Sequence, residues 1–350
     1  NLRLGACGSV PLVRREELLE RQEEFPRERL SAWLDRLGYP AVDLVDLAGD
    51  VSPRRYLRIE LRNGGSVILA SYPEAVRSAC CRFVVTTSRL EAVGVRVPAL
   101  LAVDCDAGLM LIEDAGESTL YARGGTGWRD LYPYYEKAVE IARRIAGIPP
   151  ADVARLSPPL GEALLRQELQ QTWELFLLPG GLTGGRELSE RLRRGFDELC
   201  SHLGRERAVP CHRDFMVRNL VPQEPPPDLV VLDHQDLRLG PPFYDLASLF
   251  NDSLFPPRWI EDRLLKPMLD SIAARLSYHR AAAQRTLKAV GTFAAFSRRG
   301  LDRHRRLIPP TLRRALHHLA RLPETEAVTG ELARLWSPVL EPAPDRDLLD

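Results

Sequence analysis

The stretch "CHRDFMVRNL", residues 211–220, places a histidine, two arginines, an aspartate and an asparagine within eight residues of an otherwise apolar neighbourhood. A solvated surface turn would more commonly be built from Gly, Ser or Lys. We therefore expect the polar side chains of this loop to serve a site. Their spacing, and the segments on either side, indicate which kind of site it is.

The loop reads H-R-D, four residues, then N, which is the full pattern of a kinase catalytic loop. Nineteen residues after Asp214, the apolar run "VVLD" ends at Asp233. Phosphoryl transfer needs a carboxylate that accepts the proton of the acceptor hydroxyl, and oxygen ligands that hold Mg²⁺ on the nucleotide phosphates. Asp214 suits the first task, and Asn219 and Asp233 suit the second. A hairpin would bring the loop and the strand end together.

The alternative interpretation is structural. Asp214 and Asn219 would form an Asx-turn, and Asp233 would only mark the end of a strand. A bare D-x-x-x-x-N pattern often arises by chance. The complete constellation, which follows a β-rich segment and precedes "GPPFYDLASL" (residues 240–249), does not. We therefore expect a phosphoryl-transfer site.

The composition is that of an ordinary globular protein. The chain has 350 residues, 45% of them hydrophobic and 27% charged, which is enough to bury one large core or two lobes. The formal net charge is zero, so no overall field favours nucleic acid or an anionic membrane as a partner. No apolar run approaches the ~18 residues that a membrane helix needs.

Cysteine usage indicates the compartment. The six cysteines form no C-x-x-C pair and show no regular spacing, which argues against a zinc site and against a disulfide framework. Residues 1–15 lack the apolar core of a secretory signal. We therefore expect a reducing, cytoplasmic environment. Only three of the 48 basic residues are lysines (Lys137, Lys266 and Lys288), and this scarcity bears on the site.

The first third of the chain predicts mostly strands. The expected elements are an amphipathic helix at 14–37 interrupted at Pro26, strands on both sides of a turn at 49–53, a hairpin turn at "NGG" (63–65) leading into "SVILASY" (66–72), a helix at 74–93 closed by Gly94, and a strand pair around 106–108. Three hairpin-linked strands, one helix and two further strands predict a small antiparallel β-rich lobe.

After Asp114 the pattern becomes helical. The expected elements are helices at 128–147, 160–178 and 186–203, a short β segment at 208–232, and consecutive helices from 243 to 337. The cluster "PQEPPP" (222–227) is interpreted as a stiff hairpin loop rather than as a ligand for proline-binding modules. The predicted domains are an N-terminal helical extension (1–38), a β-rich N-lobe (39–113) and a larger, mainly helical C-lobe (114–350). Ligands bind in clefts between such lobes.

The chain resembles the aminoglycoside phosphotransferase and choline kinase-like enzymes, which share the protein-kinase fold. The segments "CHRDFMVRNLV", "VVLDHQDLRLGPPFYDLASLFND" and "LAGDVSPRRYLRIEL" carry the resemblance, which covers residues 40 to 320 approximately. Within that superfamily they look closest to the bacterial anomeric sugar kinases of cell-wall recycling, which phosphorylate the C1 hydroxyl of N-acetylmuramate and N-acetylglucosamine. The resemblance implies a bilobal α+β fold, a nucleotide-binding N-lobe, a catalytic C-lobe, and an ATP- and Mg²⁺-dependent sugar kinase.

The resemblance also assigns roles to individual residues. Asp214 would be the catalytic base, and Asn219 and Asp233 would be the Mg²⁺ ligands. Asp245, in "YDLASL", would brace the catalytic loop by accepting backbone N–H bonds, and His212 would support the loop. The alternative for Asp245 is a favourable carboxylate at a helix N-terminus, and both interpretations can hold together.

One feature of protein kinases is missing. They place a lysine on the third strand, paired with a helix glutamate, to hold the nucleotide phosphates. Here "SVILASY" contains no lysine. The helix that follows has Glu74 at its start and Glu91 in its last turn, with no acid in its middle. Because both halves of the ion pair are absent together, we expect an arginine of "SPRRYLR" to hold phosphate instead.

Three arginines are candidates for this role. Strand alternation puts Arg55 on the face of Leu57 and Ile59, and it puts Arg54 and Arg58 on the opposite face. For any one of them, a solvated strand charge is an equal alternative.

Two further segments are expected to contact the nucleotide. The turn from Gly49 to Ser52 would direct backbone N–H groups at the phosphates. The segment "LIEDAG" would offer backbone groups near Glu113 to the adenine, an expectation that rests on position alone.

The acceptor is expected to bind near Asp214. Gln235 and Asp236 could hydrogen-bond sugar hydroxyls, or they could stabilise the turn that they occupy. A basic C-lobe suits a carboxylate-bearing sugar better than a polycationic aminoglycoside, although solvated helix faces explain most of these charges. The basic residues are Arg298, Arg299, Arg303, Arg305 and Arg306, with Lys288 upstream. The pair His317–His318 has no partner at metal spacing and is expected at the surface.

Two classes of function stay open at this point. The first is a small-molecule kinase that acts on an amino sugar, with aminoglycosides, choline-like amines or other alcohols as alternative acceptors. The second is a nucleotide-binding pseudokinase module, which the missing lysine suggests. A module that only binds nucleotide has no chemical need for Asp214, so the enzyme is favoured, with in-line attack and no phospho-enzyme.

Overall fold

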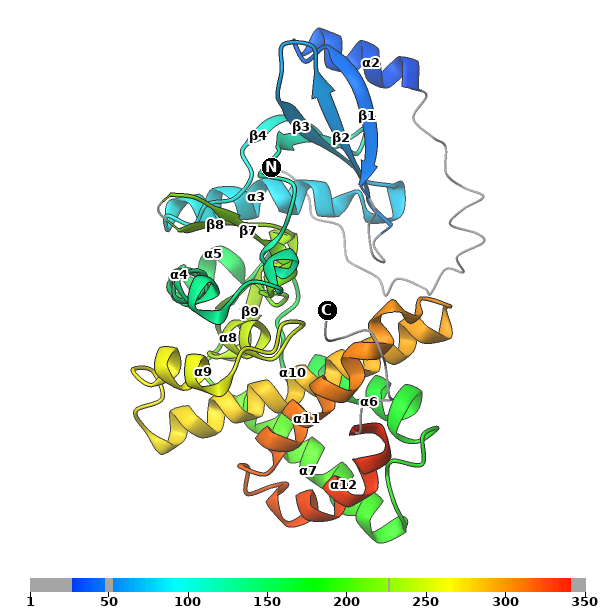
Figure 1. The fold of residues 1–350 in the computed structure, drawn as a ribbon, viewed down its shortest axis with the longest axis vertical. Helices are drawn as coiled ribbons and strands as arrows, with labels where there is room; N and C mark the ends of the chain where they lie inside the picture. The colour runs from blue at the N-terminus through cyan, green and yellow to red at the C-terminus, as the bar shows by residue number, and fades with distance from the viewer. Residues whose placement is uncertain (1–26, 48–52, 226, 341–350) are drawn as a thin grey trace. The chain divides into compact units, whose positions relative to one another are not determined.

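The computed structural model describes residues 27–47, 53–225 and 227–340 (Figure 1). Its contacts divide the chain into two compact units. The sheet unit contains the described residues up to Cys81 together with Ala99–Asp114, and the helical unit contains Arg82–Pro98 and the residues from Ala115 onward. The expected helix before residue 27 and the turn residues Gly49 and Ser52 lie outside the described residues.

The sheet unit is a five-stranded antiparallel sheet with the order β1-β2-β3-β5-β4. Its strands, in blue and cyan in Figure 1, are β1 (Ala41–Leu47), β2 (Arg55–Leu61), β3 (Ser66–Ser71), β4 (Leu100–Asp104) and β5 (Leu109–Glu113), with helix α2 (Arg27–Arg36) before them. Leu30 and Leu34 of α2 pack with Ile59, Leu69 and Leu111 in one buried cluster. Apolar alternation along the strands therefore builds this core.

The hairpin between β2 and β3 confirms the turn expected at "NGG". Gly64 and Gly65 have φ values of 86° and 81°. Residues with a side chain rarely adopt this left-handed backbone conformation, which explains why two consecutive glycines stand at this position.

Helix α3 (Ser78–Ala92) follows the short turn η1 (Glu74–Val76), as expected, and Gly94 has a φ of 70° just after it. Residues 82–98, most of α3 included, group by their contacts with the helical unit. The sequence analysis had placed them in the N-lobe.

The helical unit alternates long helices with two small ladders. Its first elements are η2 (Leu120–Arg123), α4 (Trp128–Ala146), α5 (Pro150–Val153), α6 (Glu162–Thr172), which continues as the π-helical turn η3 (Trp173–Leu177), and α7 (Arg186–Arg205). The strands of the two ladders and two short helical turns follow. In chain order they are β6 (Val209–Cys211), η4 (Val217–Asn219), β7 (Leu220–Gln223), β8 (Asp228–Val231), η5 (His234–Asp236) and β9 (Arg238–Gly240).

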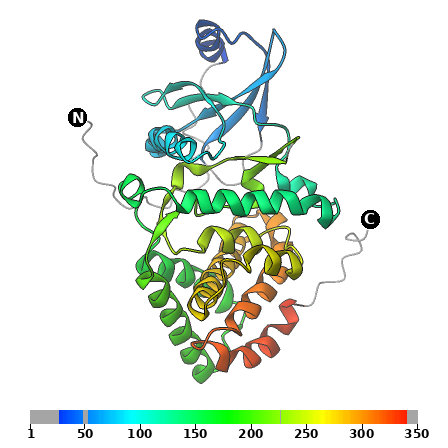
Figure 2. The same ribbon diagram turned by 90° about the vertical axis from the view of Figure 1, so that its left-hand side faces the viewer.

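Each ladder pairs two antiparallel strands, β6 with β9 and β7 with β8. The β7–β8 pairing confirms that the proline cluster lies in a hairpin. Strand β9 was not predicted, because three residues are too few to show a period. Helix α4 packs against β6, β8 and α8 (Figure 2).

The remaining elements are helices, as predicted: α8 (Tyr244–Phe250), α9 (Arg258–Leu265), α10 (Ile272–Arg298), η6 (Asp302–Leu307), α11 (Ile308–Leu319) and α12 (Glu326–Leu340). Helix α10 packs against α6, α7, α8 and α11, so most of its circumference is buried. At Gly291 an added Cβ would lie 2.3 Å from Thr172 Oγ1 of α6, which fixes how closely the two helices approach. None of the helices that the structure describes is both long enough and apolar enough to cross a membrane.

Candidate active site

Asp245 fixes the backbone of the catalytic loop. Its carboxylate lies in the first turn of α8 and is almost fully buried. It accepts the backbone N–H of His212 at 2.7 Å and that of Arg213 at 2.9 Å. Arg213 has a φ of 76°, a conformation that costs a non-glycine residue about 1 kcal/mol or more. The two hydrogen bonds expected of Asp245 are therefore present, and they hold a strained residue next to Asp214.

Hydrogen bonds also join the loop to the end of β8. The buried ring of His212 contacts the Leu232 carbonyl through Nε2 at 2.9 Å. The Leu232 N–H donates to the Asn219 carbonyl at 2.8 Å, and the Asn219 side chain donates through Nδ2 to the Asp214 carbonyl at 2.8 Å. Segments 212–219 and 232–233 thus form one local assembly.

Two oxygen donors in this assembly fit a magnesium ion. Because Asn219 uses Nδ2 for its bond to the loop, its Oδ1 is the atom left for a ligand. Asp233 has a left-handed φ of 58° and accepts a hydrogen bond from Gln235 Nε2 at 2.9 Å, which orients its carboxylate. Mg²⁺ is commonly held by one or two protein oxygens, with water and phosphate oxygens completing the octahedron. Within the described residues there is no group of three or more His, Cys, Asp or Glu arranged to bind a metal.

Asp214 lies beside two cations from α10. Arg285 Nη2 and Lys288 Nζ are each 3.6 Å from Asp214 Oδ1. Burial alone would raise the pKa of Asp214, but the charges of Lys288, Arg213 and Arg285 outweigh it and hold the pKa below its ordinary value. Asp214 is therefore ionised at neutral pH.

Arg213 is held by a second set of buried polar groups. Its guanidinium donates to Glu168 Oε1 at 3.0 Å, and Gln284 of α10 donates to the other oxygen of Glu168 at 2.9 Å. Tyr244 donates to Gln284 at 3.0 Å. Since buried polar groups are costly unless they are bonded, this chain fixes the loop against α6, α8 and α10.

The two residues expected to bind the acceptor are engaged within the chain. Gln235 is buried and donates to Asp233. Asp236 lies 3.3 Å from Arg238 Nη2 and 3.6 Å from Arg213 Nη1. These contacts agree with the alternative interpretation, in which both residues stabilise the turn that they occupy.

Two of the three candidate arginines of the sheet unit, Arg55 and Arg58, have carboxylate partners. Arg55 pairs with Asp46 at 3.1 Å on the surface. Arg58 binds Asp114 with Nε at 2.6 Å and Nη2 at 3.1 Å, and Ser66 donates to the same carboxylate. Arg54 lies directly before the first residue of β2, with its guanidinium 5.9 Å from the centre of the Tyr56 ring.

The Glu113 backbone N–H donates to the Ala99 carbonyl at 2.9 Å. The Ala99 N–H in turn donates to the Glu113 side chain at 3.1 Å. The amide of Glu113 itself is thus already engaged within the sheet unit.

One expectation about basic residues needs correction. His318 is fully buried, not at the surface, and its ring nitrogens contact His279 and Asn251 at 2.9 Å each, because α11 turns it toward α10. The side chain of Lys288 is only 17% exposed and lies beside Asp214. The five downstream arginines (Arg298, Arg299, Arg303, Arg305 and Arg306) are exposed, as expected.

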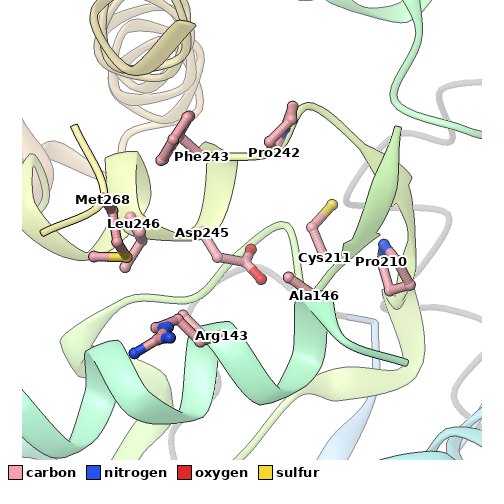
Figure 3. Close-up of a pocket in the computed structure, with 10 residues that line it drawn as sticks. Arg143, Ala146, Pro210, Cys211, Pro242, Phe243, Asp245, Leu246 and Met268 are labelled. Carbon is pink, nitrogen blue, oxygen red and sulfur yellow. The ribbon is translucent and has the colours of Figure 1, made fainter. Parts of the chain in front are cut away.

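A small pocket borders the buried side of Asp245 (Figure 3). Its lining is largely apolar and includes Phe243, Leu246 and Met268, with Arg143 at one side. Neither Asp214 nor either candidate magnesium ligand lines it. Burial raises the pKa of Asp245 to about 6, with the backbone N–H bonds opposing the shift.

The sequence did not predict three residues that are distant from the loop along the chain but lie against it in space. They are Glu168, Arg285 and Lys288. A signal was available for two of them. In "AAAQRTLKAV" (residues 281–290), polar residues stand among small apolar ones, and Arg285 and Lys288 are three apart on one helix face. The same reasoning that singled out residues 211–220 would have predicted buried partners for them.

Comparison with known proteins supplies the family. A profile of the phosphotransferase enzyme family matches residues 43–267. The chain is 31% identical over 336 residues to the N-acetylmuramate/N-acetylglucosamine kinase of Pseudomonas aeruginosa, a match that covers 87% of this chain and 95% of that one. It is 29% identical over 345 residues to the enzyme of the same name from Neisseria meningitidis, which covers 91% and 97%.

Solved structures share the fold at lower identity. A choline kinase from Streptococcus pneumoniae has a TM-score of 0.57 at 14% identity, covering 84% of this chain and 98% of that one. An ADP-bound aminoglycoside phosphotransferase has a TM-score of 0.57 at 15% identity, covering 84% and 97%. These likenesses confirm the predicted fold, a five-stranded antiparallel sheet followed by a mainly helical region.

Proposed function

The chain belongs to the phosphotransferase enzyme family, and from that premise we propose that it is an ATP- and Mg²⁺-dependent sugar kinase. The proposed acceptor is the anomeric C1 hydroxyl of N-acetylmuramate and of N-acetylglucosamine. The observation that carries the catalytic part is the position of Asp214, which lies beside two cations of α10 and in one assembly with Asn219 and the strand end at Asp233. The named activity of the relatives from Pseudomonas and Neisseria supports the acceptor.

In this proposal Asp214 orients the acceptor hydroxyl and takes up its proton. The hydroxyl oxygen forms a bond to the γ-phosphorus, the bond between that phosphorus and the β,γ-bridging oxygen breaks, and ADP leaves with the electron pair. No phospho-enzyme forms. A carboxylate with a lowered pKa is a weak base, but a loose transition state demands little proton transfer before the phosphorus moves. Orientation is therefore the main task of Asp214.

Asn219 and Asp233 would hold magnesium through Oδ1 and the carboxylate. The ion would neutralise charge on the nucleotide phosphates. Gln235 acts on this ligand set by fixing the Asp233 carboxylate. His212 and Asp245 support the loop through the bonds described above.

Residues 39–113 are the proposed nucleotide-binding lobe, and residues 114–350 are the proposed catalytic lobe. Kinases of this family use ATP, and a relative of the same fold binds ADP. The turn from Gly49 to Ser52 and the adjacent Arg54 would contact the phosphates, with Arg55 and Arg58 as further candidates, and backbone groups near Glu113 would contact the adenine. Gln235 and Asp236 are proposed to contact the sugar only at its edge, since both have partners within the chain.

Such a kinase would convert amino sugars released from the cell wall into sugar 1-phosphates in the cytoplasm, where ATP is available. The test is acceptor-dependent ADP formation across a panel that contains N-acetylmuramate, N-acetylglucosamine, a kanamycin-like aminoglycoside and choline. We expect turnover with the two amino sugars, phosphate on C1 by NMR, and no turnover with the amines.

The Asp214→Asn variant tests the chemistry itself. Equal ATP consumption by the wild type and this variant would exclude Asp214 from catalysis and would favour a nucleotide-binding module. Reaction of the amines but not of the sugars would refute the proposed acceptor.

A further inference from the structure

We propose that Lys288 of α10 is a catalytic residue that donates hydrogen bonds to the phosphoryl group in transfer, with Arg285 as the fixed ionic partner of Asp214. This inference rests on the proposed phosphoryl transfer at Asp214. It does not depend on which alcohol accepts the phosphate. Neither residue lies in residues 43–267, the segment matched by the family profile.

The two cations differ in how they are held. Arg285 is buried, donates through Nε to Ser248 at 3.0 Å, and approaches Asp214 through Nη2. Lys288 makes no hydrogen bond through Nζ within the described part of the chain, and its one ionic neighbour there is Asp214, at 3.6 Å. An ammonium group has three donors. Arg285 is thus fixed, whereas Lys288 keeps its donors for a ligand.

Position decides which part of the reacting complex Lys288 reaches. A base acts on a hydroxyl oxygen within about 2.6–3.2 Å, and that oxygen attacks phosphorus from about 3–3.5 Å. An ammonium group 3.6 Å from the base is therefore close to the non-bridging oxygens of the phosphoryl group. Those oxygens carry the charge of the transition state, and a fixed donor aimed at them stabilises it.

The charge balance near Asp214 supports the same role. Arg285 and Lys288 both approach Oδ1 of this carboxylate. Burial lowers the pKa of Lys288, and Asp214 opposes that shift by favouring the ammonium form. One cation is enough to balance the charge of Asp214. The second would balance the negative charge of a phosphoryl group bound beside it. Lys288 keeps its protons throughout, since the hydroxyl proton goes to Asp214.

The packing of α10 fixes the position of Lys288 and Arg285 relative to the loop. Gln284, one residue before Arg285, is bonded to Glu168 and Tyr244, and Gly291, three residues after Lys288, lies directly against Thr172. The segment that carries both cations is therefore fixed on either side. Positioning of this kind is what catalytic donors require.

The experiment compares Lys288→Met with Lys266→Met in the full chain. Lys266 is exposed at the end of α9, so its variant controls for the loss of one lysine charge. We expect Lys288→Met to lower kcat about 100-fold or more, as loss of one transition-state donor does in other enzymes. The loss should be equal for N-acetylmuramate and N-acetylglucosamine, with the acceptor KM changed less than about threefold. Lys266→Met should stay within about twofold of the wild type.

Amine rescue separates catalysis from folding. In Lys288→Ala, added methylammonium should fill the space left by the side chain and restore part of kcat in a saturable manner, while a small neutral alcohol should not. A merely structural role would give no such rescue. If Lys288→Met does not fold, Lys288→Ala with and without the amine gives the same comparison.

Three results would overturn the inference. They are a kcat for folded Lys288→Met within about fivefold of the wild type, a loss confined to N-acetylmuramate, which would place Lys288 at the acceptor carboxylate, and an absence of amine rescue. Failure of the proposed acceptor looks different, because the wild type itself would phosphorylate neither sugar. The variants would then be compared in ATP hydrolysis with water as the acceptor, where the same loss is expected.

Discussion

The Arg58–Asp114 pair of the sheet unit and the group around Asp214 in the helical unit use the same charges in opposite ways. Arg58 binds Asp114 through two nitrogens at 2.6 and 3.1 Å, and Ser66 adds a third hydrogen bond to that carboxylate. Asp214 has two cations at 3.6 Å and accepts no side-chain hydrogen bond from the described residues. The first carboxylate is bonded within its own unit, and the second has no such bond, as its proposed role toward a substrate requires.

The difference shows what each arrangement can do. A carboxylate whose oxygens are bonded within the protein contributes to stability and has little capacity left for a ligand. A carboxylate that is kept ionised without being bonded can orient a hydroxyl. We therefore expect substitutions at the first site to change the free energy of unfolding, and substitutions at the second to change kcat.

The largest expected effect comes from the two aspartates taken as a matched pair. Asp214→Asn should lower kcat about 10³-fold, because the amide neither accepts the hydroxyl proton nor carries the charge. Asp114→Asn should keep kcat within about threefold of the wild type and should destabilise the fold instead. Steady-state ADP formation and urea unfolding measure the two quantities. A large loss of kcat in Asp114→Asn with an intact fold would break the comparison.

A third carboxylate, Asp245, is buried and forms no ion pair within the part of the chain that the structure describes, so it should make stability depend on pH. Its pKa is about 6 in the folded protein and near its ordinary value of 3.8 in the unfolded chain. Between these values the folded state keeps the proton and the unfolded state does not. The free energy of unfolding should therefore fall as pH rises from 4 to 6, by at most about 3 kcal/mol from this group.

Urea unfolding across this pH range, for the wild type and Asp245→Asn, measures the effect. The variant should lose this part of the slope. Near pH 4 it should also be less stable than the wild type, since one backbone N–H of the loop loses its acceptor at a cost of about 1–3 kcal/mol, and this difference should shrink as the pH rises and Asp245 of the wild type ionises. A slope of equal size in both proteins would assign the pH dependence to other groups.

A smaller effect is expected when the sheet-unit pair is opened. The side chains of Arg58 and Asp114 are only 20% and 8% exposed. Arg58→Gln removes the cation and the two-nitrogen hydrogen bonding from the buried Asp114 carboxylate and should lower the free energy of unfolding by about 2 kcal/mol. Urea denaturation at pH 7 gives this value, and kcat should stay near that of the wild type. An unchanged stability with a raised KM for ATP would instead assign Arg58 to the nucleotide.

The smallest effect is expected from Arg55→Gln, which is the control for the preceding variant. Arg55 and Asp46 are 41% and 62% exposed, so solvent screens their attraction. The free energy of unfolding should change by less than about 0.5 kcal/mol. A change as large as that of Arg58→Gln would show that exposure does not separate the two pairs.

The sequence predicted the parts of the site that are local along the chain. The H-R-D-x-x-x-x-N spacing singled out Asp214 and Asn219, and the hydrogen bonds expected of Asp245 are present because a short segment brings it back to the loop. The fold class followed from hairpin turns and strand alternation, which are local as well. The magnesium and nucleotide roles stay predictions.

What the sequence did not predict depends on distant partners. Lys288 is 74 positions from Asp214, and no local pattern links the two. The expectation that His318 lies at the surface was wrong because α10, and not the neighbours of His318 in sequence, sets its environment. Similarly, Arg55 and Arg58 are of the residue type that binds phosphate. No pattern in the sequence indicates that they pair with Asp46 and Asp114 instead.

Helix α10 begins at Ile272, after the last residue that the family profile matches. A gene fragment that stopped near that point would still encode every motif residue, and a genome survey would count it as an intact kinase. Its product would lack Arg285 and Lys288, two of the cations beside Asp214, and one wall of the helical core. Under the role proposed for Lys288, a fragment of this chain that ends before α10 would thus carry every motif residue and still lack a catalytic residue.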